Sequence, residues 1–255
     1  MKIKQLFLLS LIAIFSVVSF LYIKNIDRKK DNQVIVVGTS ADYPPYAFID
    51  TTNNEVVGFD IDVAREVVSR LYKKIIIKDI PFSSLIFDLF AQKINVIAAG
   101  MTPTARRSRG VLFSQKYLEA DPLMVITKKF YSNINSLEGL AGKTVVVNTG
   151  YTADLYLSDK SDINIVRLKT PAESFMALKS GSVDAFVCAK SSLVAFLSKS
   201  SAQDYFIAKL PDTGDDYALV VSKHDHGMLE QINKALDGMK KDGTLQALKK
   251  KWNLE

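Results

Sequence analysis

Three arginines stand within four residues directly after a short apolar segment, a pattern that is able to bind an anion. The apolar segment, Ile94–Ala99, has the length and β-branched content of a buried strand. A guanidinium near the end of such a strand can grip a carboxylate through two parallel hydrogen bonds. The same three residues, Arg106, Arg107 and Arg109, are equally typical of a solvated basic turn, so the local pattern leaves both interpretations open.

The residues between this strand and the arginines have the features of a helix start. Thr102 and Thr104 flank Pro103, a combination that suits the N-cap and the first helical turn. Unpaired amide groups at a helix start attract anions, and Arg107 falls within that first turn. In the anion-site interpretation, backbone amides and the Arg107 guanidinium therefore act together.

The elements that position this site alternate between strands and helices. The predicted strands are Gln33–Thr39, Lys74–Ile80 and Ile94–Ala99. An amphipathic helix begins near Gly58, and a second, Phe82–Phe90, precedes the third strand. This βαβ alternation predicts a parallel α/β sheet.

A second α/β unit begins after Pro122. Its predicted strands include Lys143–Gly150, Ile163–Leu168 and Ser182–Cys188. The strand Tyr217–Ser222 returns the chain to the first unit, and two amphipathic helices follow it.

These elements predict an α/β protein of two lobes, each a mixed sheet flanked by helices, joined by two hinge crossings. Lobe 1 comprises residues 33–121 and 217–255, and lobe 2, inserted into it, comprises residues 122–216. Ligands of open α/β sheets bind beyond the carboxyl ends of the strands. We therefore expect the turns Gly100–Thr102 and Gly150–Thr152 to face one cleft, which favours the anion site over the basic surface turn.

Residues 1–32 differ from the rest of the chain. Lys2 and Lys4 precede an apolar run from Leu6 to Ile23, and a short polar linker follows. This pattern is typical of a signal peptide, and the run is also long enough to remain as a membrane anchor. Both interpretations predict export, either to the periplasm or to the outer face of the cytoplasmic membrane.

Composition argues against several other classes of protein. Hydrophobic residues make up 48% and charged residues 24%, as in ordinary globular proteins. The net charge is +6, but the sequence has no basic stripe with interleaved aromatic residues, so nucleic-acid binding is not predicted. His224 and His226 in a polar loop are typical of exposed side chains, and Cys188 lacks a basic partner. We expect a monomer with no metal and no cofactor.

An ordered set of motifs connects the chain with a known family. The segments GTSADYPPYAF, GFDIDVAREV, AGMTPTARR, FSQKY, GKTVVVNTG and GSVDAF resemble those of polar amino-acid-binding proteins of bacterial ABC importers. These are family 3 extracellular solute-binding proteins with the type II periplasmic binding fold, and the similarity spans residues 33–255. The resemblance implies that a small carboxylate-bearing ligand, with a polar or cationic amino acid as the leading candidate, is captured between the lobes and delivered to a membrane permease.

The resemblance also implies roles for individual residues at the carboxylate end of the ligand. In proteins of this family, the arginine at the position of Arg107 grips the α-carboxylate, helped by the N–H group and hydroxyl of the residue at Thr102. The second lobe adds an N–H group at Thr152, with Tyr151 alongside.

At the other end of the ligand, the resemblance implies that the backbone of Ala99 and Gly100 helps to hold the α-amino group. Tyr43 and Phe82 match the positions that sandwich the ligand side chain. Taken alone, Phe82 is more typical of a core aromatic.

Two positions depart from the family pattern. The acid that usually pairs with the ligand ammonium is replaced by Ala189, and a second position that is often acidic is Ser40. A buried ammonium without a carboxylate partner is costly. The resemblance therefore predicts a carboxylate-bearing ligand more directly than a standard α-amino acid. Acids that would compensate, if they reach the cleft, are Asp42, Asp121, Asp215 and Asp216.

Two alternatives share this fold. Cyclohexadienyl dehydratases resemble the family, but such an enzyme needs an acid or base placed in the cleft. No carboxylate stands at a matched position, so we predict non-catalytic capture. The other alternative is an amino-acid sensor held at the membrane by an uncleaved N-terminal segment.

Overall fold

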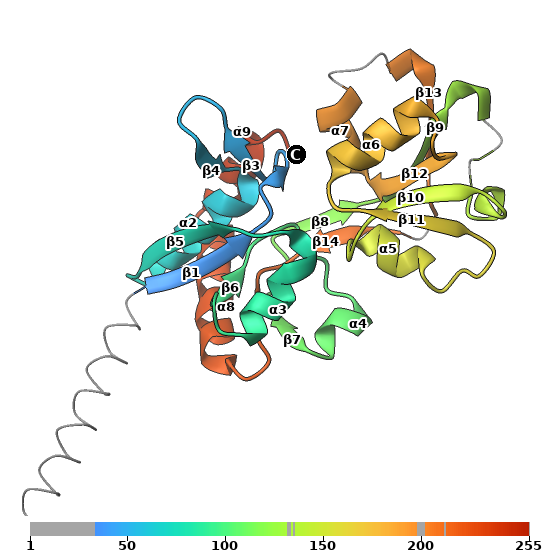
Figure 1. The fold of residues 1–255 in the computed structure, drawn as a ribbon. Coiled ribbons are helices and arrows are strands. Elements are labelled where there is room, and N and C mark those ends of the chain that lie inside the picture. The colour runs from blue at the N-terminus through green and yellow to red at the C-terminus, as the bar shows by residue number, and fades with distance from the viewer. Residues whose placement is uncertain (1–33, 132–133, 135, 198–201, 212, 255) are drawn as a thin grey trace, which may run out of the picture.

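The computed structural model describes residues 34–131, 134, 136–197, 202–211 and 213–254. The chain forms two lobes, each built on a five-stranded mixed sheet with helices on both faces, as the sequence predicts (Figure 1). The predicted signal peptide or anchor, residues 1–32, lies outside the described residues. None of the helices in the described ranges has an apolar run long enough to cross a membrane.

The sheet of lobe 1 has the strand order β5-β1-β6-β15-β7. Strands β5, β1 and β6 are parallel, whereas β15 is antiparallel to both of its neighbours. The bounds are Lys74–Asp79 for β5, Val34–Thr39 for β1, Val96–Ile97 for β6, Val220–Ser222 for β15 and Val111–Phe113 for β7. The predicted strand Ile94–Ala99 therefore pairs over only its central residues.

Helices cover both faces of this sheet. Ile61, Ala64 and Val67 recur at helical spacing in α2 and are buried, which explains why this segment forms a helix against the sheet. One apolar core lies under α2, α8 and α9, and a smaller one lies under α3. The bounds are Phe59–Arg70 for α2, Phe82–Ser84 for η1, Leu85–Phe90 for α3, Ala105–Ser108 for α4, His226–Lys241 for α8 and Thr244–Lys251 for α9.

Lobe 2 repeats this arrangement with the order β11-β10-β12-β9-β13. Strands β11, β10 and β12 are parallel, and β9 runs antiparallel between β12 and β13. The bounds are Asn164–Leu168 for β11, Thr144–Asn148 for β10, Ala185–Ala189 for β12, Leu123–Lys128 for β9 and Tyr205–Lys209 for β13.

Helix α5 packs on one face of the second sheet, and α6 and α7 pack on the other. Helix α6 is well defined by its sequence, since Thr170 and Glu173 form a capping box, Pro171 opens the helix and Gly181 ends it. The bounds are Thr152–Leu157 for α5, Pro171–Ser180 for α6 and Lys190–Leu197 for α7.

Short elements complete the chain. A small sheet of β2, β3 and β4 precedes α2 in lobe 1, and three 3-10 turns lie in lobe 2. The bounds are Asp42–Tyr43 for β2, Ala47–Asp50 for β3, Glu55–Val57 for β4, Lys129–Tyr131 for η2, Glu138–Leu140 for η3 and Ala202–Asp204 for η4.

The two lobes are joined by an antiparallel pair of strands, β8 (Leu118–Asp121) and β14 (Asp215–Tyr217) (Figure 1). The predicted single strand Tyr217–Ser222 is wrong, because the chain leaves β14 at Tyr217 and enters the lobe 1 sheet as β15. Between the two strands, the Ala218 amide donates to the Met101 carbonyl. One extended segment thus contributes first to the hinge pair and then to the lobe 1 sheet.

Candidate ligand-binding site

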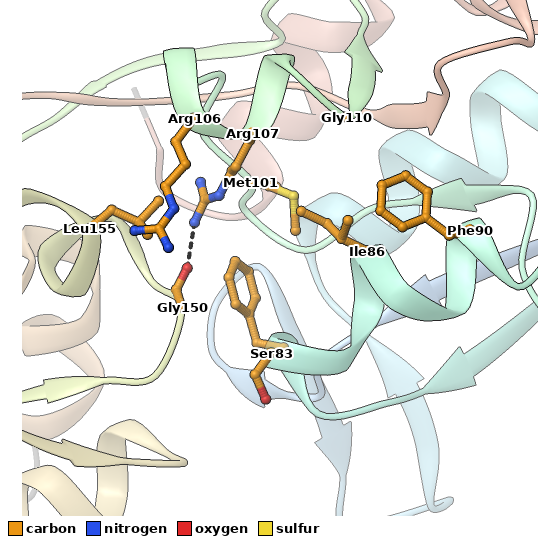
Figure 2. A pocket seen from close by; sticks show the side chains of 10 residues that line it. Ser83, Ile86, Phe90, Met101, Arg106, Arg107, Gly110, Gly150 and Leu155 are labelled. Atoms are coloured by element: carbon orange, nitrogen blue, oxygen red, sulfur yellow. Dashed lines mark hydrogen bonds between the residues drawn. The ribbon is translucent and has the colours of Figure 1, made fainter.

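Arg107 lies at the boundary between the lobes. Its backbone amide donates to Oγ1 of Thr104, the N-cap of α4, at 3.2 Å. Its buried guanidinium donates to the Thr102 carbonyl at 2.8 Å and, across the boundary, to the Gly150 carbonyl at 2.7 Å (Figure 2). Because α4 is a single turn, the guanidinium rather than a helix dipole supplies most of the positive charge here.

Within the described part of the chain, the charge of Arg107 has no counter-ion in close contact. Only 7% of the residue is exposed, and none of the ion pairs among the described residues includes it. Burial lowers its pKa to about 10, against the opposing charge of Asp215. A buried cation held mainly by carbonyl groups is costly, so a carboxylate that reached it would be strongly attracted.

Aromatic side chains from both lobes surround this guanidinium. The ring centroids of Phe82 and Tyr151 are 4.3 Å apart, and the Arg107 Cζ atom lies 5.5 Å from the Phe82 ring. Tyr43 contacts Tyr151 edge-on, at 6.1 Å. Phe82 is half-buried: it packs against the smaller lobe 1 core, and its ring also contacts Tyr151 of the other lobe.

On the lobe 1 side, the turn after β6 is held by a buried carboxylate. Gly100 has a positive φ of 55°, and its amide donates to Asp60 Oδ2. A Cβ on Gly100 would lie 3.0 Å from the Tyr43 ring, so a glycine is needed at this close approach. The side chain of Ala99 packs into the lobe 1 core, which leaves its backbone as the part available to a ligand.

Asp60 was not predicted to belong to the site. In the sequence it is an acid in the first turn of a helix, where negative charge suits the dipole. Its contact with Gly100 joins residues 40 positions apart, and no local pattern encodes such a pairing.

On the lobe 2 side, the turn after β10 has a similar construction. Gly150 has a φ of 78°, and its amide donates to Asp154 at 2.8 Å. Tyr151 is the N-cap residue of α5, Thr152 is its first residue, and the Tyr151 hydroxyl donates to Asp42 at 3.5 Å. The two predicted turns therefore meet at the lobe boundary.

The hinge strands place two acids at this boundary, since Asp121 of β8 is the register partner of Asp215 of β14. Burial raises the pKa of Asp215 to about 6, against the opposing effects of the nearby Thr102 and Thr152 hydroxyls and of the Arg107 charge. Thr102 Oγ1 and Asp215 Oδ1 are buried and have no hydrogen-bond partner among the described residues.

Asp121 is the centre of a second polar group. Its carboxylate accepts from the Ser191 amide at 3.1 Å, from the Ser191 hydroxyl and from the Tyr217 hydroxyl at 2.7 Å. The Tyr43 hydroxyl lies 2.8 Å from Ser191 Oγ and 3.0 Å from the Tyr217 hydroxyl. This group joins lobe 1, lobe 2 and both hinge strands.

The positions that depart from the family pattern are both buried. Ala189 ends β12 and packs in the lobe 2 core, and Ser40 follows β1. Burial raises the pKa of Asp42, and the neighbouring Ser40 hydroxyl opposes this effect. Asp216 forms an ion pair with Lys116.

An open pocket of about 320 Å³ adjoins Arg107 between the lobes. Figure 2 shows Arg106 and Arg107 extending toward Leu155 and Gly150 of lobe 2, with Ile86 and Phe90 on the lobe 1 side. Within the described residues, no cluster of His, Cys, Asp and Glu side chains is arranged to hold a metal ion.

Two α/β lobes on a pair of hinge strands, with a buried cation and aromatic side chains at their boundary, define a type II periplasmic binding protein. The family described as bacterial extracellular solute-binding proteins, family 3, matches residues 35–255. The chain belongs to this family.

Similar proteins cover nearly all of the chain. The arginine-binding extracellular protein ArtP of Bacillus subtilis (strain 168) is 32% identical over 236 residues, which cover 89% of this chain and 89% of that protein. The ABC transporter glutamine-binding protein GlnH of the same organism is 31% identical, over 88% of this chain and 82% of its own. A solved structure of an ancestral arginine-binding protein bound to arginine has a TM-score of 0.80 and 36% identity, over 86% of this chain and 98% of that one.

Proposed function

We propose that this protein captures an amino acid with a cationic side chain between its lobes, as the extracytoplasmic binding component of an ABC importer, and releases it unchanged. Relatives named for arginine and glutamine binding support an amino-acid ligand, and arginine is the first candidate. The membrane permease of the importer is the proposed partner.

The observation that carries this proposal is the buried guanidinium of Arg107, which bonds to carbonyl groups of both lobes. A ligand carboxylate that replaced the Gly150 carbonyl would form charge-assisted bonds, which contribute about 1.5–3 kcal/mol each. Such a ligand would also offer acceptors to the Thr102 hydroxyl, which lacks a partner among the described residues. We therefore assign the carboxylate end of the ligand to Arg107, Thr102 and Thr152.

The balance of charge at the boundary supports a cationic ligand. Once a ligand carboxylate pairs with Arg107, the acids Asp42, Asp121 and Asp215 have no comparable cation facing them from the described residues that surround the site. Positive charge on the ligand would offset them in this poorly hydrated space. Phe82 and Tyr151 would at the same time cover the side chain of the ligand.

A thermal-shift screen of amino acids and small carboxylates, followed by calorimetry, tests the proposal. A cleft ligand raises the midpoint of unfolding because it binds only the folded protein. We expect the largest shift with L-arginine or L-lysine, and no chemical change of the ligand after prolonged incubation. Equal shifts for neutral and cationic amino acids would contradict the charge argument, and turnover of the ligand would contradict simple capture.

Arg107→Ala is expected to weaken binding by about 2–5 kcal/mol, because the ligand carboxylate would lose a desolvated partner. Arg109→Ala is the matched control: this arginine is exposed two residues away, and its loss should change affinity less than about threefold. Calorimetry of both variants gives the comparison. Near-normal affinity of Arg107→Ala would remove the basis of the proposal.

A further inference from the structure

We propose that Asp121 carries the negative charge that recognises the α-ammonium group of the ligand, in the role for which Ala189 has no side chain. This inference rests on the proposed function, since it requires that the ligand be an α-amino acid. It assigns the hinge strand β8, rather than the end of a lobe 2 strand, to ligand recognition.

The register of the lobe 2 sheet places Asp121 beside the position that Ala189 leaves without a charge. Ala189, the last residue of β12, pairs with Leu123, and Asp121 lies two residues before Leu123. The Lys190 amide donates to the Pro122 carbonyl, and the Ser191 amide donates to Asp121 Oδ1. The first turn of α7 therefore holds the Asp121 carboxylate just beyond the end of β12.

The hydrogen bonds around Asp121 show an excess of acceptors. Three hydroxyls, those of Tyr43, Ser191 and Tyr217, make four contacts with one another and with the carboxylate. Each hydroxyl has one proton, so three protons serve four contacts, and one oxygen pair lacks a hydrogen between its atoms. These oxygens therefore have unused acceptor capacity, and an ammonium group would bring three further donors to them.

The Asp121 carboxylate has unused hydrogen-bond acceptor sites for such a donor. Among the described residues, Oδ1 accepts from the Ser191 amide alone, whereas a carboxylate offers about four lone-pair sites in total. Among the described residues, no lysine or arginine forms an ion pair with Asp121. Burial and the Asp121 charge both raise the pKa of the Tyr43 hydroxyl well above its usual range. The negative charge of Asp121 therefore acts on Tyr43, beside which the ligand is proposed to lie.

The other acids at the boundary are placed less well for this role. Asp215 is near Arg107, Thr102 and Thr152, which we assign to the ligand carboxylate. The Asp42 carboxylate accepts from the Tyr151 hydroxyl at 3.5 Å and has Ser40 as a neighbour, whereas no contact joins it to Gly100 among the described residues. Asp121 is next to Tyr43, the aromatic that lies closest to Gly100, whose backbone is expected to share the ammonium group.

Matched ligands that differ only in the ammonium group test the inference. The probes are L-arginine and 5-guanidinopentanoate, and L-glutamine and 4-carbamoylbutanoate, measured by calorimetry. We expect the wild type to prefer each amino acid by about 30-fold or more, and Asp121→Asn to lose most of that preference while binding of the deaminated probes changes less than about threefold. The asparagine keeps the volume and one acceptor.

Two further variants separate charge from packing. Tyr217→Phe removes a hydroxyl that bonds Asp121 but keeps the charge, so the preference for the amine should persist. Asp215→Asn should change the affinity for both members of a pair alike. A wild type that binds amine and deaminated probes equally, or an Asp121→Asn variant that retains the preference, would overturn the inference and leave the proposed function standing. Failure of the wild type to bind these probes and every other cationic amino acid would overturn both.

Discussion

The two turns that meet at the lobe boundary have the same backbone geometry but are stabilised differently. Each follows a parallel strand, each has a glycine with positive φ, and in each the glycine amide donates to a carboxylate. In lobe 2 that carboxylate, Asp154, also forms an ion pair with Arg167 at 2.8 Å. In lobe 1 the carboxylate is Asp60, which is fully buried, and the described residues give it no cationic partner.

This difference has an energetic consequence. Burial raises the pKa of Asp60 to about 7, against the opposing effect of the Gly100 amide, and Asp60 Oδ1 has no hydrogen-bond partner among the described residues. The lobe 1 turn therefore depends on an acid that is costly to ionise, whereas the charge in lobe 2 is compensated. Equivalent turns in the two lobes should respond differently to substitution and to pH.

The largest expected effect comes from placing an alanine in each turn. Both glycines have positive φ, which costs a non-glycine residue about 1–2 kcal/mol. At Gly100 the new Cβ would also press on the Tyr43 ring at 3.0 Å, whereas at Gly150 the nearest atom, in Ser83, is 3.8 Å away. Gly100→Ala should therefore lower the free energy of unfolding by about 3 kcal/mol and Gly150→Ala by about half as much. Denaturant titration measures both, and equal losses would show that Tyr43 is free to move.

An intermediate effect is expected from the charge of Asp60. Because its folded pKa is raised, the folded protein retains a proton that the unfolded chain releases, so stability falls as pH rises from about 4 to about 7. Asp60→Asn removes this cost and should raise the free energy of unfolding by about 1–2 kcal/mol at pH 8, with little change near pH 4. Thermal unfolding at the two pH values checks this. Destabilisation at pH 8 would mean that the negative charge itself is needed in lobe 1.

The smallest effect is expected from Asp154 in lobe 2. Replacing this acid by asparagine should lower the free energy of unfolding, whereas Asp60→Asn should raise it. Asp154→Asn keeps an acceptor for Gly150 but loses the ion pair with Arg167, whose side chain is 44% exposed. We expect a loss of stability below about 1 kcal/mol at pH 8. A double-mutant cycle of Asp154→Asn with Arg167→Ala should give a coupling energy of about 0.5 kcal/mol. Stabilisation by Asp154→Asn would remove the contrast between the two lobes.

Much of the fold could be predicted because it is encoded locally. The spacing of Ile61, Ala64 and Val67 predicted α2, and the apolar runs at Val34–Thr39 and Thr144–Asn148 predicted β1 and β10. The strand at Tyr217–Ser222 failed for a physical reason. Its residues are extended throughout, and periodicity cannot show which sheet each part will join.

The candidate site likewise has a part that the sequence predicted and a part that it did not. Residue types and spacing drew attention to the three arginines and the two glycine turns, but they left a solvated basic turn equally open, and the family resemblance pointed to Arg107. The sequence left open which acid would face the cleft. It also left open whether Phe82, which taken by itself is typical of a core aromatic, would contact the ligand. These questions depend on contacts such as Asp121 with Ser191, across 70 residues, and Tyr43 with Tyr217, across 174.

By itself, then, the sequence determined two α/β lobes and the turns at the carboxyl ends of their strands, since these follow from local periodicity, and it favoured a cation between the lobes only once the two turns were placed at one cleft. Only the tertiary structure decided which carboxylates are buried, which are paired and which lie against the ligand-binding turns. The physical reason is that an aspartate in the first turn of a helix has the same local signature whether it forms an ion pair, as Asp62 does with Lys251, or is buried under a turn, as Asp60 is. Its surroundings come from segments far away in the chain, and they decide whether its charge supports the fold or awaits a ligand.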